Sequence, residues 1–143
     1  MEVVVRYHSN MTFTSRGPSG HDLPLDAAPD AGGTNSGARP MEMLLGALGG
    51  CTGMNVVSIL RKMRVDYDAF EMHIHGERAE EHPRQFTAIH VEYRFAGEGL
   101  EAKRAQIERA VQLSHDRYCS VAASLNPAIP VTYGITLNED RGE

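Results

Sequence analysis

The fold is decided by the run PMEMLLGALGGCTGMNVVSIL, which extends from Pro40 to Leu60. Nearly every residue in this run is apolar or small, and Glu42 is its only charged residue. A proline just before a helix, an acidic residue in its first turn and basic residues in its last, here from Arg61 onward, are typical of an α-helix. We therefore expect a helix over residues 41–63, about 35 Å long and, because it is apolar all round, buried on all sides.

The rest of the chain predicts six strands and two further helices around this helix. Apolar and polar residues alternate clearly over 70–78 and 86–95, which is typical of half-buried antiparallel strands. The expected strands are residues 2–8, 11–15, 21–25, 70–78, 86–95 and 129–137, and the expected further helices are residues 100–115 and 118–125. The order β-β-β-α-β-β-α-α-β indicates an α+β fold, and we expect a single domain over residues 1–143.

Length, charge and composition exclude several classes of protein. A chain of 143 residues is long enough for one domain with its own core. The net charge of −5 and the scattered basic residues argue against nucleic acid as a partner. We expect no membrane span and no signal peptide, and therefore a cytoplasmic protein. The loop over residues 27–40 is rich in proline and glycine, and its length favours a functional or partner-contacting role.

The chain contains two cysteines, Cys51 and Cys119, and its chemistry is expected to run through them as a reducible thiol pair. Cys51 lies in the middle of the expected central helix, among glycines that leave space for another group over the sulfur. Cys119 lies at the expected start of a short helix, where the helix dipole favours the thiolate. The alternative for each is a buried cysteine that packs as a small apolar residue.

A thiol in an apolar place needs a neighbouring group to hold it ionised, since burial alone raises its pKa. An arginine held by a carboxylate is the natural candidate. Arg16 and Arg39 lie in expected loops, and Glu42, in the first turn of the helix, could hold either one. The alternatives are simple matching of Glu42 to the helix dipole and solvation of both arginines.

Histidine supplies the alternative hypothesis of a metal site. His73 and His75 lie two residues apart on the polar side of an expected strand, and His21 and His115 could join the two cysteines. The spacing of His73 and His75 can chelate a metal, but no third ligand is evident, and no ligand spacing supports the second set. We therefore expect neither a metal nor another cofactor.

Two motifs in this sequence resemble those of one family. The run Pro40–Thr52, continuing through Val57–Leu60, resembles the central-helix signature of the OsmC/Ohr family, which comprises osmotically inducible protein C and organic hydroperoxide resistance protein. The run Arg109–His115, followed by Tyr118–Val121, resembles the second cysteine motif of that family. The order of the elements fits as well, so the resemblance covers essentially the whole chain, and it is strongest to the OsmC-like branch.

The resemblance implies an intertwined homodimer, in which antiparallel sheets wrap two central helices and two active sites lie at the interface. It implies a cysteine-based, dithiol-dependent peroxidase that reduces organic hydroperoxides in oxidative stress defence. Cys51 would be the thiolate that attacks the peroxide, and Cys119 the thiol that resolves the sulfenic acid into a disulfide. In this family lipoylated proteins are the favoured dithiol donors, and neither a metal nor a flavin is required.

One departure from the family pattern concerns the group that activates Cys51. The characterised peroxidases have a glutamate directly after the proline that matches Pro40, whereas here Met41 takes that place and Glu42 follows. One residue turns a helix by about 100°, which changes the direction of the carboxylate. The family's activating arginine comes from a loop before the helix, which nominates Arg16 or Arg39. The alternative function is therefore a non-catalytic OsmC-like protein that binds a small molecule or senses oxidants.

Overall fold

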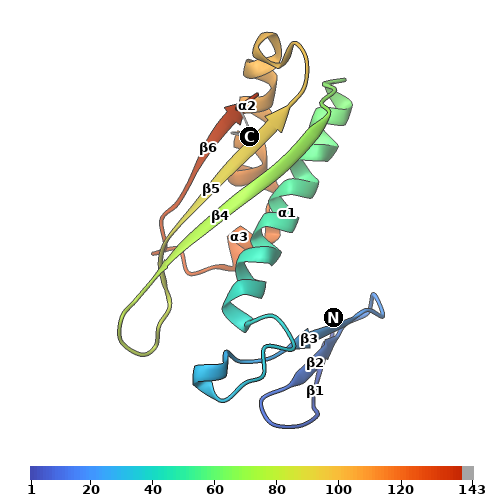
Figure 1. Ribbon diagram of the computed structural model, residues 1–143. Helices are drawn as coiled ribbons and strands as arrows, with labels where there is room; N and C mark the ends of the chain where they lie inside the picture. Colours follow the sequence, from blue (N-terminus) through green and yellow to red (C-terminus); the bar gives the residue numbers. More distant parts are fainter. Residues whose placement is uncertain (140–143) are drawn as a thin grey trace. The chain divides into compact units, whose positions relative to one another are not determined.

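The computed structural model describes residues 1–139 and divides the chain into two compact units, Met1–Leu44 and Leu45–Glu143. Its elements follow the expected order β-β-β-α-β-β-α-α-β, with short 3₁₀ and π turns added (Figure 1). The α+β fold expected from the sequence is confirmed. The two units are described separately below.

The first unit contains a three-stranded antiparallel sheet in the order β1-β2-β3. These strands are shorter than the expected ones, and their bounds are β1 Val4–Tyr7, β2 Phe13–Arg16 and β3 Asp22–Leu25. The turn between β2 and β3 closes where the N–H of Gly20 donates to the carbonyl of Gly17 at 3.0 Å. Gly20 has φ +81°, a conformation that favours glycine.

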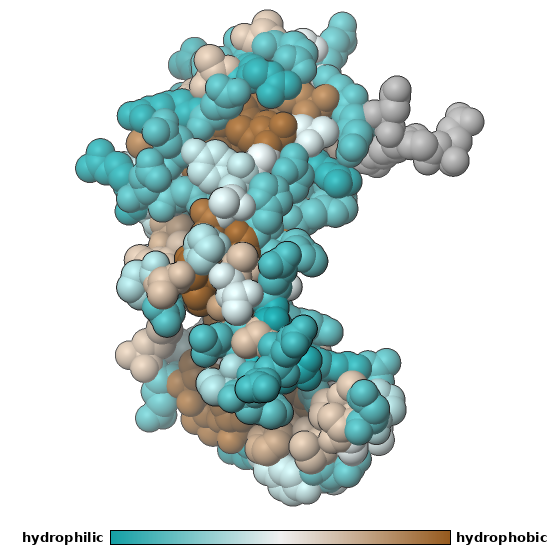
Figure 2. Space-filling view, turned by 90° about the vertical axis from the view of Figure 1, so that its left-hand side faces the viewer, coloured by the Kyte–Doolittle hydropathy of each residue, from teal (hydrophilic) through white to brown (hydrophobic). Residues whose placement is uncertain are grey.

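The register of this sheet separates a polar face from an apolar face. Val4 pairs with Arg16 and Arg16 with Asp22, so these three side chains share one face. The opposite face carries apolar side chains that are exposed within the chain, namely Val3, Val5, Tyr7, Phe13 and Leu23. Figure 2 shows hydrophobic residues, in brown, on the surface of the molecule. An apolar face of this kind is typical of a surface that a partner covers.

One buried carboxylate organises the loop after β3. Asp26, which is 3% exposed, accepts hydrogen bonds from the main-chain N–H groups of Ala27, Thr34 and Ser36 at 2.7–3.0 Å. The hydroxyls of Thr34 and Ser36 also donate to it, at 3.0 and 2.8 Å. These donors, the Ser36 N–H first, hold the pKa of Asp26 well below its usual range. The expected irregular loop therefore has a fixed structure, with one 3₁₀ turn at Pro29–Ala31.

The second unit contains a sheet of three strands in the order β4-β5-β6. β4 Ala69–Arg78 and β5 Phe86–Ala96 are antiparallel, and their expected alternation of buried and exposed side chains is confirmed. β6 Val131–Leu137 pairs with β5 in parallel. The expectation of purely antiparallel sheets is therefore wrong. The chain crosses over through helices between β5 and β6, and a crossover connection of that kind produces a parallel pair.

The helices of this unit are more divided than the sequence pattern suggests. The central helix α1 spans Pro40–Lys62, as expected. The single helix expected over residues 100–115 is instead a 3₁₀ turn at Leu100–Lys103, α2 at Arg104–Leu113 and a π turn that begins at Ser114. A short α3, Ser120–Ser124, follows. The π turn ends where the N–H of Cys119 donates to the carbonyl of Ser114, five residues earlier, at 2.9 Å.

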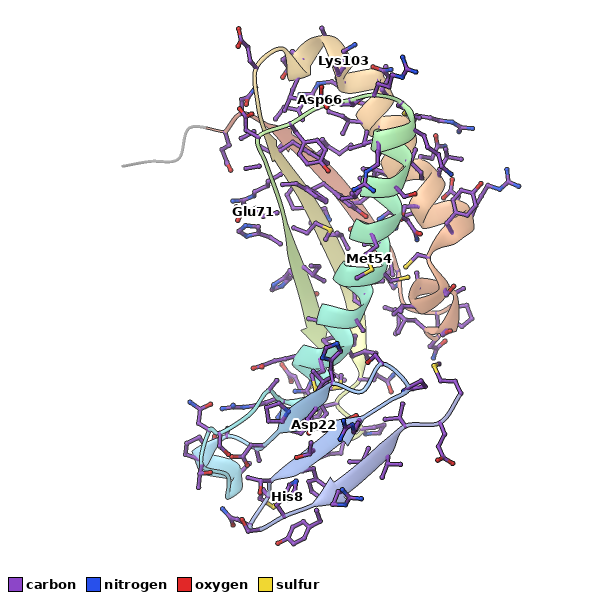
Figure 3. The ribbon with its side chains drawn as sticks, turned by 90° about the vertical axis from the view of Figure 1, so that its right-hand side faces the viewer. His8, Asp22, Met54, Asp66, Glu71 and Lys103 are labelled. Atoms are coloured by element: carbon purple, nitrogen blue, oxygen red, sulfur yellow. The ribbon has the colours of Figure 1, made fainter. Side chains whose placement is uncertain are left out.

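α1 and α2 lie on the same face of the second sheet, and their inner sides form the core with it (Figures 1 and 3). Two glycines allow α1 to lie very close to β4. A Cβ added to Gly49 would meet Cδ1 of Ile74 at 2.7 Å, and one added to Gly53 would overlap the end of Met72. The close approach that the glycines predicted is therefore present. The largest fully buried side chains of this core are Leu48, Val56, Leu60, Ile89, Val91, Tyr93, Leu100, Ile107 and Val111.

α1 is covered on one side only within the chain. Met54, labelled in Figure 3, is 74% exposed, so the expectation of burial on all sides is wrong for a single copy. One sheet and one helical layer can cover only one stripe of a helix, which is why the apolar outer stripe remains exposed. By length and composition alone, α1 is also apolar enough to cross a membrane. The expectation that no stretch of the chain is that long and apolar is therefore wrong.

We predict that Asp26→Asn weakens the hydrogen bonds that hold the loop after β3 in its fixed structure. Asparagine has one acceptor oxygen in place of two and turns an N–H₂ group toward the main-chain donors, which leaves buried N–H groups unpaired. The amides of Thr34 and Ser36 should exchange with deuterium at least about tenfold faster, as NMR would show. The matched control is Asp30→Asn in the same loop. Equal protection in both variants would contradict this account.

The pH dependence of the same loop follows from the lowered pKa of Asp26. A carboxylate whose folded pKa is depressed stabilises the fold above its unfolded pKa of about 3.9, and that contribution is lost as the pH falls through the folded value. Protection of the Thr34 and Ser36 amides should therefore persist from pH 7 to about pH 4 and be lost only in stronger acid. Loss of protection already near pH 5 would contradict the assignment.

Candidate functional site

The structure brings the two cysteines together in the second unit. Cys51 lies on α1 and is half-buried, whereas Cys119 caps the N-terminus of α3 and is 4% exposed. Both are free thiols, and the Cys119 thiol donates a hydrogen bond to the sulfur of Cys51. Residues 68 positions apart in the sequence are thus in contact, although their roles as attacking and resolving thiols stay predictions.

The environment of Cys51 favours its thiolate. The main-chain N–H of Val121 lowers the pKa of Cys51 most, and the Cys119 thiol and the N–H of Ser120 add to the effect. Burial acts in the opposite direction and is outweighed. Hydrogen bonds donated to a sulfur stabilise its charged form, so the amides at the start of α3 serve as the activating group in this unit.

The environment of Cys119 favours its thiol. Burial raises the pKa of Cys119, and the N–H of Ala122, which reaches its Sγ at 3.4 Å, offsets this only in part. The expectation that the helix terminus holds Cys119 as a thiolate is therefore wrong. The N–H of Val121 also lowers the pKa of Cys119, but burial outweighs the main-chain donors there and leaves the pKa raised.

A buried network of hydroxyl groups lies directly behind the cysteines, and the sequence analysis did not single it out. Thr52, the residue after Cys51, contacts the hydroxyl of Tyr93 at 2.5 Å and that of Ser114 at 2.8 Å. The Ser114 hydroxyl also donates to the Thr52 carbonyl at 3.1 Å. Thr52, Tyr93 and Ser114 are each 0% exposed. Polar groups buried this deeply are retained only where they are fully paired.

His115 ends this network at its less buried side. Its Nε2 lies 2.8 Å from the Tyr93 hydroxyl, and its ring stacks on Tyr133 with centroids 4.6 Å apart. Burial lowers the pKa of His115, which keeps the ring neutral near pH 7. Burial also raises the pKa of Tyr93 to about 12, so this hydroxyl stays protonated. We define these four residues, Thr52, Tyr93, Ser114 and His115, as the hydroxyl–histidine network.

Arg16, Arg39 and Glu42 all belong to the first unit, and within it each has its own partners. Arg16 pairs with Asp22 at 3.6 Å. The guanidinium of Arg39 donates to the side chain of Asn35 at 2.6 Å and to the carbonyl of Gly37 at 3.1 Å. The main-chain N–H of Arg39 donates to Glu42 at 3.3 Å, so this carboxylate caps the start of α1.

Two histidines on the outer face of the second sheet, His73 and His90, pair with other side chains. His90 lies 3.0 Å from Glu92 and 2.8 Å from Thr132, and His73 lies 3.2 Å from Glu71. Among residues 1–139, no group of three or more His, Cys, Asp or Glu side chains is placed to hold a metal ion.

An apolar groove of about 370 Å³ runs along the exposed stripe of α1 in the second unit. It begins at Gly50, the residue before Cys51, and passes Met54 and Val57 toward Arg61. Phe70 and Met72 of β4 line its other side, together with Gly53 and Ser58 of α1. A concave apolar surface of this kind is suited to a hydrocarbon group.

We predict that the two cysteines differ strongly in reactivity. Near pH 7 iodoacetamide should alkylate Cys51 at least about tenfold faster than Cys119, because a thiolate reacts and the Cys119 sulfur is both protonated and buried. Peptide mapping by mass spectrometry over a time course measures both rates. In urea the difference should vanish, which serves as the control. Equal rates in the folded protein, or faster labelling of Cys119, would contradict the described electrostatics.

Known proteins resemble this chain over nearly its full length. Protein YhfA of Escherichia coli K12 is 40% identical over 136 residues, which cover 93% of this chain and 95% of YhfA. The crystal structure of a hypothetical protein from Aquifex aeolicus VF5 has 31% identity and a TM-score of 0.77, and covers 96% of this chain and 97% of its own.

A more distant structure shares the fold. The organic hydroperoxide resistance protein OhrB of Bacillus subtilis has 16% identity and a TM-score of 0.60, over 95% of this chain and 98% of its own. The sequence model of the OsmC-like protein family matches residues 33–134, which include both cysteines. The chain therefore belongs to the OsmC-like protein family, in agreement with the resemblance of its two cysteine motifs.

Proposed function

We propose that this protein is a cysteine-based, dithiol-dependent peroxidase that reduces organic hydroperoxides in the cytoplasm. One observation carries the proposal, namely that the pKa of Cys51 is lowered while a second thiol, Cys119, donates a hydrogen bond to its sulfur. A thiolate beside a protonated thiol is the arrangement that a peroxide-reducing pair requires. The family, with its hydroperoxide resistance members, supports the same chemistry.

The first step is attack of the Cys51 thiolate on the hydroperoxide. A sulfur–oxygen bond forms, the oxygen–oxygen bond breaks, and the alkoxide takes up a proton and leaves as an alcohol. Cys51 is then a sulfenic acid, oxidised by two electrons. In the second step the Cys119 sulfur attacks the Cys51 sulfur, the hydroxide leaves with the Cys119 proton as water, and a disulfide remains.

The cycle closes when an external dithiol supplies two electrons. One of its thiolates attacks the disulfide, and its second thiol releases the mixed disulfide, so that Cys51 and Cys119 return to the reduced state. A lipoyl group presents two thiols on one small molecule, which makes a lipoylated protein a suitable donor. Cys51 is the more exposed of the two sulfurs and is the expected point of attack.

An arginine is proposed to assist Cys51, and Arg39 is the better candidate. Arg16 is already paired with Asp22. The Arg39 guanidinium contacts only neutral groups, those of Asn35 and Gly37, and forms no ion pair within residues 1–139, so its positive charge is not cancelled. Glu42 holds the backbone of Arg39 at the start of α1.

A homodimer is proposed as the functional form. The exposed apolar stripe of α1, represented by Met54, and the exposed apolar face of the first sheet both need cover. Exposed apolar surface of this kind is typical of an interface between subunits. A second copy of the chain, with the same two surfaces, is the partner that the family resemblance also favours.

A second candidate function is that of a small-molecule-binding or redox-sensing protein. The apolar groove along α1 favours it, because such a groove can hold a ligand without any reaction. In that case Cys51 and Cys119 would form a disulfide under oxidation but would not turn over. A co-purified ligand seen by native mass spectrometry would favour this candidate.

We predict that the wild-type protein consumes cumene hydroperoxide when dihydrolipoamide is supplied. Cys51→Ser should abolish the reaction, because no other thiolate is available. Cys119→Ser should use about one equivalent of peroxide with a sulfenic acid on Cys51, which dimedone traps for mass spectrometry. If the wild type consumes peroxide no faster than Cys51→Ser, the peroxidase proposal fails.

We predict that Arg39→Ala slows this reaction by about tenfold, the loss expected for one unit of pKa at Cys51, whereas Arg16→Ala changes it little. The two variants remove the same group from loops of the same unit and so control for each other. A loss with Arg16→Ala alone would transfer the role to Arg16, and no loss with either would show that the amides of α3 suffice.

We predict that the protein elutes with the mass of two chains, rather than the 15.7 kDa of one, in size-exclusion chromatography with light scattering. Met54→Asp should weaken the dimer, since it would bury a carboxylate without a partner at the interface. Met54→Leu keeps the apolar surface and serves as the control. A wild-type mass of 15.7 kDa would contradict the dimer.

A further inference from the structure

We propose that the hydroxyl–histidine network is the device that positions the cysteine pair, with Tyr93 as its central residue. The network has no place in the reaction steps given above, yet it connects the residue after Cys51 with the turn that precedes Cys119. The inference rests on the proposed function for its biological meaning, and the test below needs no peroxide.

Ser114 bonds to both segments that carry the cysteines, namely α1 and the turn before α3. Its carbonyl accepts the Cys119 N–H at 2.9 Å and so closes the π turn. Its hydroxyl contacts Thr52 at 2.8 Å and donates to the Thr52 carbonyl at 3.1 Å. Cys119 is therefore hydrogen-bonded directly to Ser114, and Cys51 is the neighbour in sequence of Thr52, to which Ser114 is also hydrogen-bonded. π turns of this kind occur frequently at functional sites.

Tyr93 joins Thr52, the hydrogen-bond partner of Ser114, to His115 of the π turn. Its hydroxyl lies 2.5 Å from the Thr52 hydroxyl and 2.8 Å from Nε2 of His115. The sheet thus holds α1 through Thr52 and holds the π turn through His115. Because Tyr93 is 0% exposed on a central strand, its position is fixed by the core.

The way the three hydroxyl protons are used indicates that the network positions the two cysteines and does not carry protons to their sulfurs. With neutral His115, the Tyr93 hydroxyl donates to Nε2 and the Thr52 hydroxyl donates to Tyr93, while the Ser114 hydroxyl shares its proton between the hydroxyl and the carbonyl of Thr52. Each of the three hydroxyls then uses its one proton within the network. The chain ends at a carbonyl oxygen, so its effect is to fix geometry.

The network also influences the main-chain donors that favour the thiolate of Cys51. The amides of Ser120 and Val121, which act on Cys51, follow directly after Cys119 on the segment that the π turn fixes. A hydrogen bond to sulfur weakens steeply when its geometry is disturbed. Loosening the turn should therefore withdraw these donors from Cys51 and return its pKa toward the ordinary value of a cysteine.

The test is the pH profile of Cys51 alkylation by iodoacetamide in Tyr93→Phe, with Tyr133→Phe as the matched control. Both variants lose one phenolic hydroxyl beside His115, but only Tyr93 uses its hydroxyl in the network. Tyr93→Phe should shift the profile to higher pH and slow alkylation at pH 7 by about tenfold. Tyr133→Phe should leave the profile unchanged. Cys119 is the titratable group in contact with Cys51 among the described residues, so it is monitored in the same peptide maps.

A second pair of variants separates positioning from loss of stability. His115→Gln keeps a hydrogen-bonding group near the place of Nε2 and should preserve the profile, whereas His115→Ala should shift it as Tyr93→Phe does. An unchanged Cys51 profile in Tyr93→Phe, even with a lower melting temperature, overturns the proposal and leaves Tyr93 a purely structural residue. A shifted profile in a protein that reduces no peroxide would uphold positioning while rejecting the peroxidase function.

Discussion

The contact between the Cys51 sulfur and the main-chain amides at the start of α3 is the interaction on which the rest of the site depends. A half-buried thiol without a neighbouring donor or cation would ordinarily stay protonated and inert. The N–H groups of Val121 and Ser120 reverse that tendency, and the Cys119 thiol adds a further donor. Because main-chain donors cannot be moved without moving the chain, the reactivity of Cys51 is set by how the segment after the π turn is held.

The fold accounts for this contact. The crossover between β5 and β6 makes that pair parallel, and it also returns the chain, with Cys119, to the side of α1. Gly49 and Gly53 let α1 lie against β4 at a distance that no Cβ would permit without displacing Ile74 and Met72. The same burial that makes Cys119 a poor thiolate keeps its proton in place for the hydrogen bond to Cys51. The two thiols thus differ because their surroundings differ, although both lie at one site.

Much of this could be predicted from the sequence, because alternation and helix-end signals are local. The strands, α1 and the pairing of Cys51 with Cys119 in one family-like site follow from such patterns and from the resemblance. The hydroxyl–histidine network could not be predicted, since its bonds join residues 41 and 62 positions apart and its side chains resemble ordinary core residues. The helix dipole suggested a thiolate at Cys119, but burial, which is a tertiary property, outweighs it. The one-sided cover of α1 was not predicted either, because an apolar sequence does not show which sides of a helix the rest of the chain covers.

The account is tested most directly by identifying the product of one equivalent of cumene hydroperoxide added to the reduced protein. Non-reducing peptide mapping by mass spectrometry should find a single disulfide between Cys51 and Cys119, with one disulfide formed for each peroxide consumed. The disulfide should lie within one chain, which gel electrophoresis without reductant distinguishes from a cross-link between chains. If Cys51 is instead oxidised further to sulfinic acid while Cys119 stays free, the two sulfurs do not act as the pair that the structure describes.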